Sequence, residues 1–137
     1  LQTNKVKFAV KLFDYIHSVD SEKMAKKIAD EQLKINKRIK IFLQVNIGDE
    51  DQKSGIKKND IDKLISYCKE INLDLIGLMC IPPANIDPEH YFREMKQLNK
   101  NFDFKELSMG MSSDYIKAAK NLSTYVRIGS SIFGQRF

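Results

Sequence analysis

Hydrophobic positions along the chain follow two alternating patterns. In residues 21–37, apolar side chains such as Met24, Ala25 and Ile28 recur at the 3.6-residue spacing of an amphipathic helix, whereas residues 39–47 are mainly apolar. The patterns predict strands at residues 13–19, 39–47, 74–82, 106–109 and 124–133. They predict one helix over residues 1–12 and a second over residues 21–37, capped by Asp20 or Ser21. A third helix is expected to be capped by Asn59 or Asp60, and a fourth to start at Asp87-Pro88. A fifth is expected to be capped by Ser112 or Ser113 and to end near Asn121.

Apolar strands that alternate with helices are typical of a parallel sheet covered by helices. Two architectures fit: an open doubly wound sheet, or part of an eight-stranded barrel. An open nucleotide-binding sheet usually carries a glycine-rich turn after its first strand, but the chain has no glycine before Gly48. Polar runs after every strand favour the barrel.

The composition is that of one ordinary globular domain, with 137 residues, 42% hydrophobic and 30% charged. No apolar run approaches the roughly 18 residues of a membrane-spanning helix, so we expect no membrane association. The net charge of +5 is spread as +5 over residues 1–40, −4 over 41–90 and +4 over 91–137. Nucleic-acid binding needs a concentrated basic stripe with stacking aromatic residues. We therefore expect solvated helix surfaces and, at most, a small anionic ligand.

The cysteine and histidine content excludes several other site classes. Cys68 and Cys80 fall at apolar positions of a predicted helix and strand, so we interpret them as core residues rather than nucleophiles or a disulfide framework. His17 and His90 are the only histidines, and no metal-ligand spacing occurs. The cytoplasm is the default expected compartment.

Polar or glycine-containing runs lie at the carboxyl ends of all five predicted strands. In parallel α/β folds, ligands bind at that end of the sheet. A single polar loop means little, but five in succession favour a shared pocket. The runs are residues 17–20, 46–49, 80–83, 108–112 and 129–131.

Two of these runs are suited to phosphate. Residues 108–112, Ser-Met-Gly-Met-Ser, lead from a strand into a helix, where Gly110 allows close backbone approach and Ser108 or Ser112 offers a hydroxyl donor. The run after Arg127 supplies Gly129 and two serines. Taken separately, a serine helix cap would explain the first run, and a tight turn at Gly129 would explain the second. Their occurrence on the last two strands, the usual phosphate site of a barrel, favours phosphate binding.

Arg127 alternates with Val126 and Ile128 and therefore faces the opposite side of its strand. In a barrel that side is the interior, where a guanidinium needs an acceptor. Two alternatives remain open from the residues alone: an ion pair, for example with Glu106, or a donor to a ligand atom near the phosphate.

The motifs, taken in order, resemble the pyridoxal-phosphate homeostasis protein family, which is similar to the N-terminal barrel of alanine racemases. The matching runs are residues 1–5, 16–21, 43–47, 53–55, 77–82, 107–112 and 126–134. The resemblance implies a (β/α)8 TIM barrel that binds pyridoxal 5′-phosphate (PLP). It also implies a role in buffering and delivering this cofactor, with PLP-dependent apo-enzymes as partners. It leaves the oligomeric state open.

The resemblance also implies a set of cofactor-binding residues. Among these, the glycines and hydroxyls would hold the phosphate, and Arg127 would face the pyridine nitrogen. An arginine keeps that nitrogen unprotonated and so weakens the electron sink that racemisation requires. The alternative function is a PLP-dependent, alanine racemase-like enzyme; a sugar-phosphate enzyme is a more distant reading. The implied set is Ser108, Met109, Gly110, Met111, Ser112, Arg127, Gly129 and Ser130.

The chain departs from the family in one important respect. The family's Schiff-base lysine, at the end of its first strand, has no counterpart here, and Leu1 matches the region after the third strand. We therefore expect residues 1–137 to be a partial barrel domain, about strands four to eight, with no catalytic residue and the Schiff-base lysine upstream of Leu1. Lys53 is expected in a surface loop, and Lys105 at the opposite end of its strand. A complete barrel usually needs about 250 residues.

Overall fold

Five parallel strands form one sheet, in the order β1-β2-β3-β4-β5, in the computed structural model, which describes residues 1–136. The strands are β1 (Tyr15–Val19), β2 (Lys40–Val45), β3 (Asp74–Cys80), β4 (Glu106–Met111) and β5 (Tyr125–Arg127). The helices are the short 3₁₀ helices η1 (Thr3–Lys5) and η2 (Lys58–Asp60), and α1 (Val6–Leu12), α2 (Glu22–Lys34), α3 (Ile61–Glu70), α4 (Glu89–Asn101), α5 (Tyr115–Lys120) and α6 (Ser130–Phe133).

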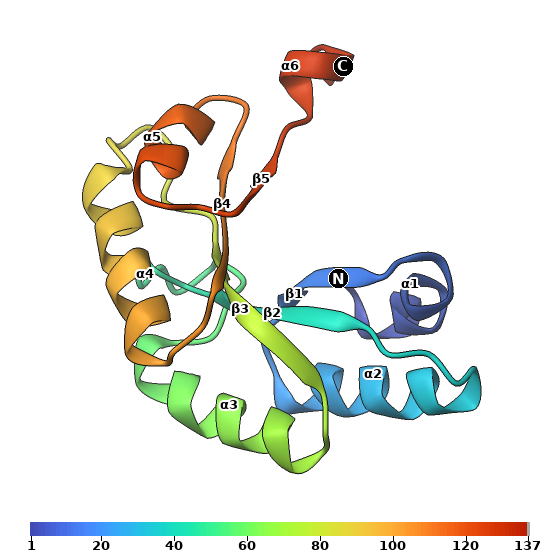
Figure 1. The fold of residues 1–137 in the computed structure, drawn as a ribbon. Coiled ribbons are helices and arrows are strands. Elements are labelled where there is room, and N and C mark those ends of the chain that lie inside the picture. The colour runs from blue at the N-terminus through green and yellow to red at the C-terminus, as the bar shows by residue number, and fades with distance from the viewer. Residues whose placement is uncertain (137) are drawn as a thin grey trace.

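The sheet is curved, and the helices that connect its strands lie around its outer side (Figure 1). Strands that are neighbours in sequence are also neighbours in the sheet, without the reversal of order that defines a doubly wound fold. The structure is therefore a five-stranded parallel half-barrel, as the second of the two predicted architectures requires. Helix α6 projects away from the rest of the molecule (Figure 1).

The core lies between the sheet and the outer helices. Strand β2 is the most completely buried: Ile41 and Leu43 join the core on the helix side, while Phe42, also fully buried, stacks on His17. This alternation follows from the two-residue period of a strand. Because β2 is covered on both faces, the inner face of the half-barrel already holds packed side chains.

Polar groups join the helix layer to the sheet at defined points. The hydroxyl of Ser21 accepts a hydrogen bond from the N–H of Met24 at 3.1 Å, so it caps α2 as predicted. The side chain of Asn99, on α4, accepts from the N–H of Leu78 at 3.0 Å and donates to the carbonyl of Glu106 at 2.9 Å. A buried amide thus ties α4 to both β3 and β4.

The end of the chain differs from the prediction. The last strand stops at Arg127 rather than continuing to residue 133, because the chain turns at Gly129 (φ −125°, ψ −76°) and residues 130–133 form α6. The N–H groups of Ile132 and Phe133 donate back to the carbonyl of Gly129 at 2.9 Å. The β-branched and aromatic residues of this segment predicted a continuous strand, but the turn at Gly129 ends the strand early.

Two helix starts also differ from the prediction. Pro88 is the N-cap of α4 rather than its first residue. Helix α5 begins after Asp114, whose carboxylate accepts from the N–H of Met111 at 2.7 Å, so neither Ser112 nor Ser113 is its N-cap. The fourth strand is longer than expected and extends to Met111.

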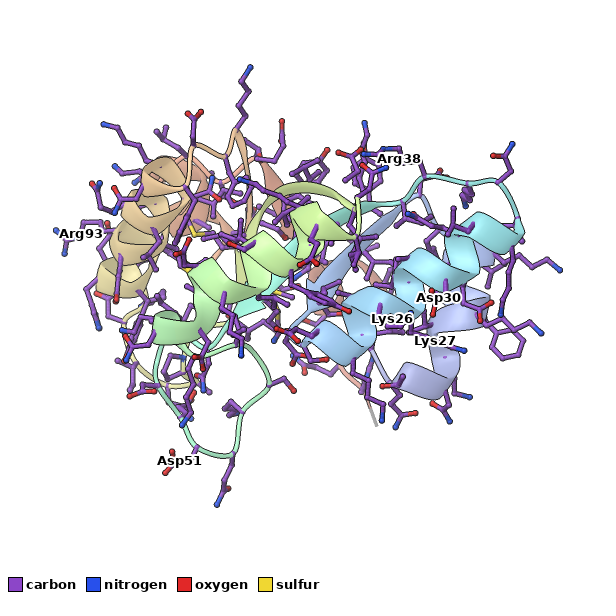
Figure 2. All side chains as sticks on the ribbon, turned by 90° about the horizontal axis from the view of Figure 1, so that it is seen from below. Lys26, Lys27, Asp30, Arg38, Asp51 and Arg93 are labelled. Carbon is purple, nitrogen blue, oxygen red and sulfur yellow. The ribbon has the colours of Figure 1, made fainter. Side chains whose placement is uncertain are left out.

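The charged residues lie mainly on the outer helices, as the dispersed charge predicted. Figure 2 shows Lys26, Lys27 and Asp30 together on α2, where Lys26 and Asp30 form an exposed ion pair at 3.2 Å. Such pairs contribute little to stability. No helix in residues 1–136 is long and apolar enough to cross a membrane, and no group of three His, Cys, Asp or Glu side chains in that range is placed to hold a metal ion.

Candidate functional site

Three side chains from three strands form a hydrogen-bonded chain on the inner face of the half-barrel. A terminal guanidinium nitrogen of Arg127, on β5, donates to the hydroxyl oxygen of Ser108, on β4, at 2.7 Å. That oxygen lies 2.8 Å from Nδ1 of His17, on β1. The second terminal nitrogen of Arg127 donates to the carbonyl of Cys80, at the end of β3, at 3.0 Å. Arg127 is therefore anchored to two neighbouring strands.

These contacts decide whether Arg127 forms the ion pair with Glu106 that the sequence left open. Its recorded partners are a neutral hydroxyl and a neutral carbonyl, and within residues 1–136 no ion pair joins it to Glu106. Burial lowers the pKa of the guanidinium below its ordinary value. Arginine side chains nevertheless keep their charge in proteins. The site thus holds a positive charge that no carboxylate of residues 1–136 neutralises by direct contact.

The environment of His17 favours its neutral form. Burial, and secondarily the positive charge of Arg127, lower the pKa of His17 below its ordinary value of 6.5. The imidazole stacks on Phe42 with ring centroids 4.3 Å apart and an interplanar angle of 26°. Its orientation is therefore fixed by an aromatic neighbour on one side and by Ser108 on the other.

A second cluster joins the two runs that were predicted to bind phosphate. The hydroxyl oxygen of Ser112 accepts hydrogen bonds from the backbone N–H groups of Gly129 and Ser131, both at 3.2 Å. Two N–H groups thus converge on one oxygen atom, as they do around an oxygen of a bound anion. Ser112 and Gly129 line a pocket of about 620 Å³, whose lining also includes Met111, Arg127 and Ser130.

The two glycines of these runs serve different purposes. A Cβ on Gly110, which has a φ of +100°, would lie 2.7 Å from Cβ of Ala118, so this glycine is required for the close packing of α5 on β4. A Cβ on Gly129 would meet nothing within 4 Å. Of these two glycines, Gly129 is therefore the one that leaves open space beside the pocket.

The structure brings five of the eight predicted cofactor-binding residues to this pocket and places the others nearby. Ser108 and Met109 are fully buried in β4. Gly110 borders a neighbouring pocket of about 400 Å³, which also contacts Arg127 and the loop after β3. The prediction did not include His17 among the site residues. Its place in a polar run at a strand end was a signal, but nothing local to it indicated a bond to Ser108.

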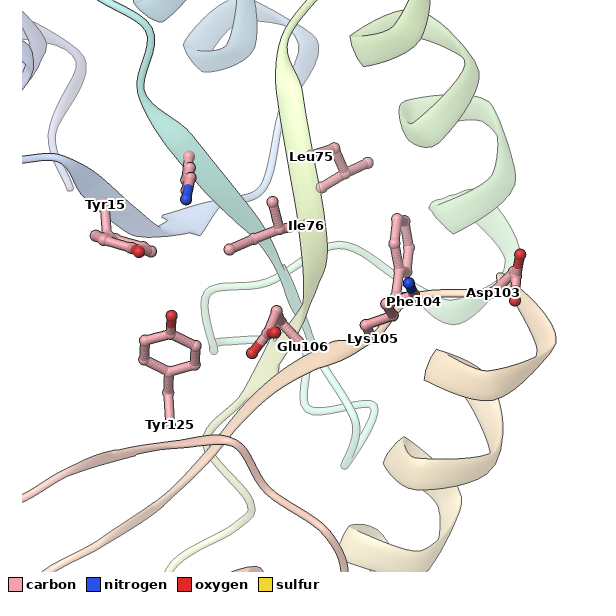
Figure 3. Close-up of a pocket in the computed structure, with 9 residues that line it drawn as sticks. Tyr15, Leu75, Ile76, Asp103, Phe104, Lys105, Glu106 and Tyr125 are labelled. Carbon is pink, nitrogen blue, oxygen red and sulfur yellow. The ribbon is translucent and has the colours of Figure 1, made fainter.

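A different pocket lies at the opposite, amino ends of the strands (Figure 3). It has a volume of about 360 Å³ and includes Tyr15, Lys40, Glu106 and Tyr125, each the first residue of its strand. Figure 3 shows Tyr15 and Tyr125, from the two edge strands, close together across this hollow; their ring centroids are 5.7 Å apart. A hydrogen bond with Tyr15 raises the pKa of Tyr125.

Comparisons with known proteins agree with the fold and the motifs. The family profile described as "Alanine racemase, N-terminal domain" matches residues 1–136. The chain belongs to this family. Curated relatives named "Pyridoxal phosphate homeostasis protein" include those of Aquifex aeolicus, 37% identical over 99% of this chain, and Haemophilus influenzae, 38% identical over 99% of it. These matches confirm the resemblance to pyridoxal-phosphate homeostasis proteins that the motifs indicated.

The chain spans 64% of the length of the Aquifex aeolicus relative and 62% of that of Haemophilus influenzae. Among solved structures of the family fold, PipY from Synechococcus elongatus with PLP bound superposes with a TM-score of 0.89 at 29% identity, covering 98% of this chain and 67% of PipY. Alanine racemase of Clostridium difficile superposes with a TM-score of 0.72 at 13% identity, which shows the shared fold alone.

Proposed function

We propose that the chain is part of a PLP-binding protein that serves PLP homeostasis as a carrier or buffer of the cofactor. The observation that carries this proposal is the pocket at the carboxyl ends of β4 and β5. There the hydroxyl of Ser112, which accepts from the N–H groups of Gly129 and Ser131, lies in the same pocket as the guanidinium of Arg127, which forms no ion pair with a carboxylate of residues 1–136. The relatives named for PLP homeostasis and the PLP-bound PipY structure support it.

The two ends of the pocket suit the two ends of PLP. At one end, the hydroxyls of Ser112 and Ser130 offer donors to the phosphate: the oxygen of Ser112 accepts from the N–H groups of Gly129 and Ser131 and so keeps its own proton to donate, and Gly129 leaves space beside it. At the other end, Arg127 presents donors from a guanidinium held by Ser108 and Cys80. The site therefore fits a molecule with a phosphate at one end and a ring acceptor at the other.

The residue that contacts the ring nitrogen of PLP helps to distinguish a cofactor carrier from a racemase. Bound PLP supplies a reactive aldehyde and an electron-withdrawing ring, and the ring withdraws electrons most strongly when its nitrogen is protonated. Arg127 only donates hydrogen bonds, so it stabilises an unprotonated ring nitrogen. This favours holding the cofactor over racemase-type catalysis. Recipients of such a cofactor would be PLP-dependent apo-enzymes.

We further propose that residues 1–137 correspond to strands four to eight of the barrel and that the Schiff-base lysine lies outside them. Lys53 is exposed on a bend in the loop after β2, and Lys105 immediately precedes β4, at the amino end of the sheet, where it lines the same pocket as Lys40. Reduction with borohydride in the presence of PLP should therefore attach no stoichiometric pyridoxyl group to one lysine, as peptide mass spectrometry would report. Stoichiometric labelling of a single lysine would contradict this proposal.

Titration calorimetry of the chain with PLP and with inorganic phosphate tests the binding site. Ser112→Ala should weaken both ligands by about three- to tenfold, as expected for the loss of one hydrogen bond to an anion. Arg127→Leu should weaken PLP more than phosphate, because PLP loses both the ring contact and the positive charge of the pocket, whereas phosphate loses the charge alone. Ser66→Ala, an exposed serine on α3, is the matched control. Equal affinities in wild type and both site variants would refute the proposed site.

A further inference from the structure

We infer that His17 is a positioning residue: acting through the hydroxyl of Ser108, it fixes the orientation of the guanidinium of Arg127 toward the ring of PLP. The inference rests on the proposed function for the identity of the ligand. It assigns a role to a residue on β1, the edge strand farthest in the sheet from Arg127 on β5. Its basis is the hydrogen-bonded chain from His17 through Ser108 to Arg127.

The directions of the two hydrogen bonds follow from the donor inventory. A guanidinium can only donate, so Ser108 accepts from Arg127. The single hydroxyl proton of Ser108 is then directed to Nδ1 of His17, 2.8 Å away, and the imidazole carries its own proton on Nε2. A protonated His17 would instead point a second donor at Ser108 and bring a second positive charge toward Arg127. The neutral form that burial favours is thus the form that completes the chain.

The same contacts explain why Arg127 needs His17. Of the two anchors of the guanidinium, the carbonyl of Cys80 belongs to the backbone and is fixed by the strand. The other anchor is the hydroxyl of Ser108, which is free to rotate about its C–O bond unless its proton has a partner. His17 provides that partner, and the stacking on Phe42 keeps its ring in place. Without His17, one of the two bonds that orient Arg127 loses its fixed direction.

Two substitutions separate this role from simple packing. His17→Phe keeps an aromatic ring against Phe42 but removes the acceptor, whereas His17→Asn removes the ring but places a polar amide atom near the position of Nδ1. Each variant is titrated with PLP and with 1-deaza-PLP, in which a C–H replaces the ring nitrogen. Wild type should prefer PLP by about tenfold, the effect of one hydrogen bond from a charged donor. The Phe variant should lower this preference to threefold or less, and the Asn variant should retain it.

The preference ratio cancels effects on the phosphate end, because both ligands carry the same phosphate. The inference is overturned if the Phe variant keeps the full preference or if the Asn variant loses it. If wild type binds the two ligands equally, the proposed contact of Arg127 with the ring nitrogen fails, and the inference about the ligand fails with it. Arg127→Leu removes the donor to the ring nitrogen. It should therefore abolish the preference for PLP over 1-deaza-PLP and give the lower limit of the measured ratio.

A measurement without ligand tests the positioning by itself. In the wild-type chain, slow rotation of an anchored guanidinium should give separate NMR signals for the Nη protons of Arg127. These signals should merge in His17→Phe and in Ser108→Ala and stay separate in His17→Asn. Separate signals in the Phe and Ala variants would overturn the positioning role, whatever the affinity for PLP. Because this measurement uses no ligand, it distinguishes failure of the positioning role from failure of the proposed PLP binding.

Discussion

The side-chain amide of Asn99, on α4, donates to the carbonyl oxygen of Glu106, the first residue of β4, at 2.9 Å. Its amide oxygen also accepts from the N–H of Leu78 on β3. Asn99→Leu should destabilise the chain by about 3 kcal/mol, because it leaves these buried backbone groups without a partner. Urea unfolding measures the change. Asn101→Leu, an exposed position at the end of the same helix, should change stability by less than about 0.5 kcal/mol.

Gly77→Ala should destabilise the sheet between β3 and β4. An added Cβ would collide with the backbone carbonyl of Glu106, which cannot move without separating the paired strands. We expect a loss of about 3 kcal/mol, the upper range for overpacking, from thermal or urea unfolding. Gly129→Ala adds the same methyl group in open space and should leave stability unchanged. Equal effects of the two substitutions would contradict the predicted collision.

Stability should depend on pH through His17. Its pKa in the folded chain is lowered, first by burial and second by Arg127, so the unfolded chain binds the proton more readily. The contribution is therefore fully present above pH 6.5 and is lost as the pH falls from there through the lowered folded pKa. In His17→Phe, the midpoint of thermal unfolding should fall less steeply with acidification than in wild type. An unchanged slope would show that His17 titrates normally.

Both cysteines should be unreactive in the folded chain. Burial raises the pKa of Cys68 and of Cys80 to about 12, so neither forms an appreciable amount of thiolate at pH 8. A chromogenic disulfide reagent should titrate no thiol in buffer and both thiols in denaturant. Rapid labelling of either cysteine without denaturant would indicate that the segment around it opens locally. This outcome would also contradict the interpretation of these residues as core side chains.

The sequence predicted those features that depend on nearby residues. The cap at Ser21, the helix that follows it and the burial of both cysteines depend on patterns within a few positions, and the structure confirms them. The order of strands and helices is likewise a local signal repeated five times. The parallel half-barrel could therefore be inferred from periodicity and from the polar runs at the strand ends.

The features that could not be predicted depend on residues far apart in the chain. Ser112 or Ser113 was expected to cap the helix that follows. Instead, the hydroxyl of Ser112 contacts backbone N–H groups 17 and 19 residues away, and Asp114 takes the capping position. Ser108 and His17 are separated by 91 positions. A serine next to a helix has a plausible local partner, so the distant contact becomes visible only when the sheet brings β4 and β5 together.

Strand β5 is attached to β4 in an unusual way, with consequences for ligand affinity. It has three residues and an irregular register, and the hydroxyls of Ser123 and Thr124 supplement its pairing by bonding to the backbone of Leu107 and Met109. Arg127 lies on this strand and Gly129 follows it. The pairing of β5 with β4 and the binding of ligand in the pocket are therefore thermodynamically linked equilibria. Saturation with ligand should slow hydrogen exchange at the amides of β5. Conversely, a substitution at Ser123 that loosens the strand should weaken affinity although it touches no ligand atom.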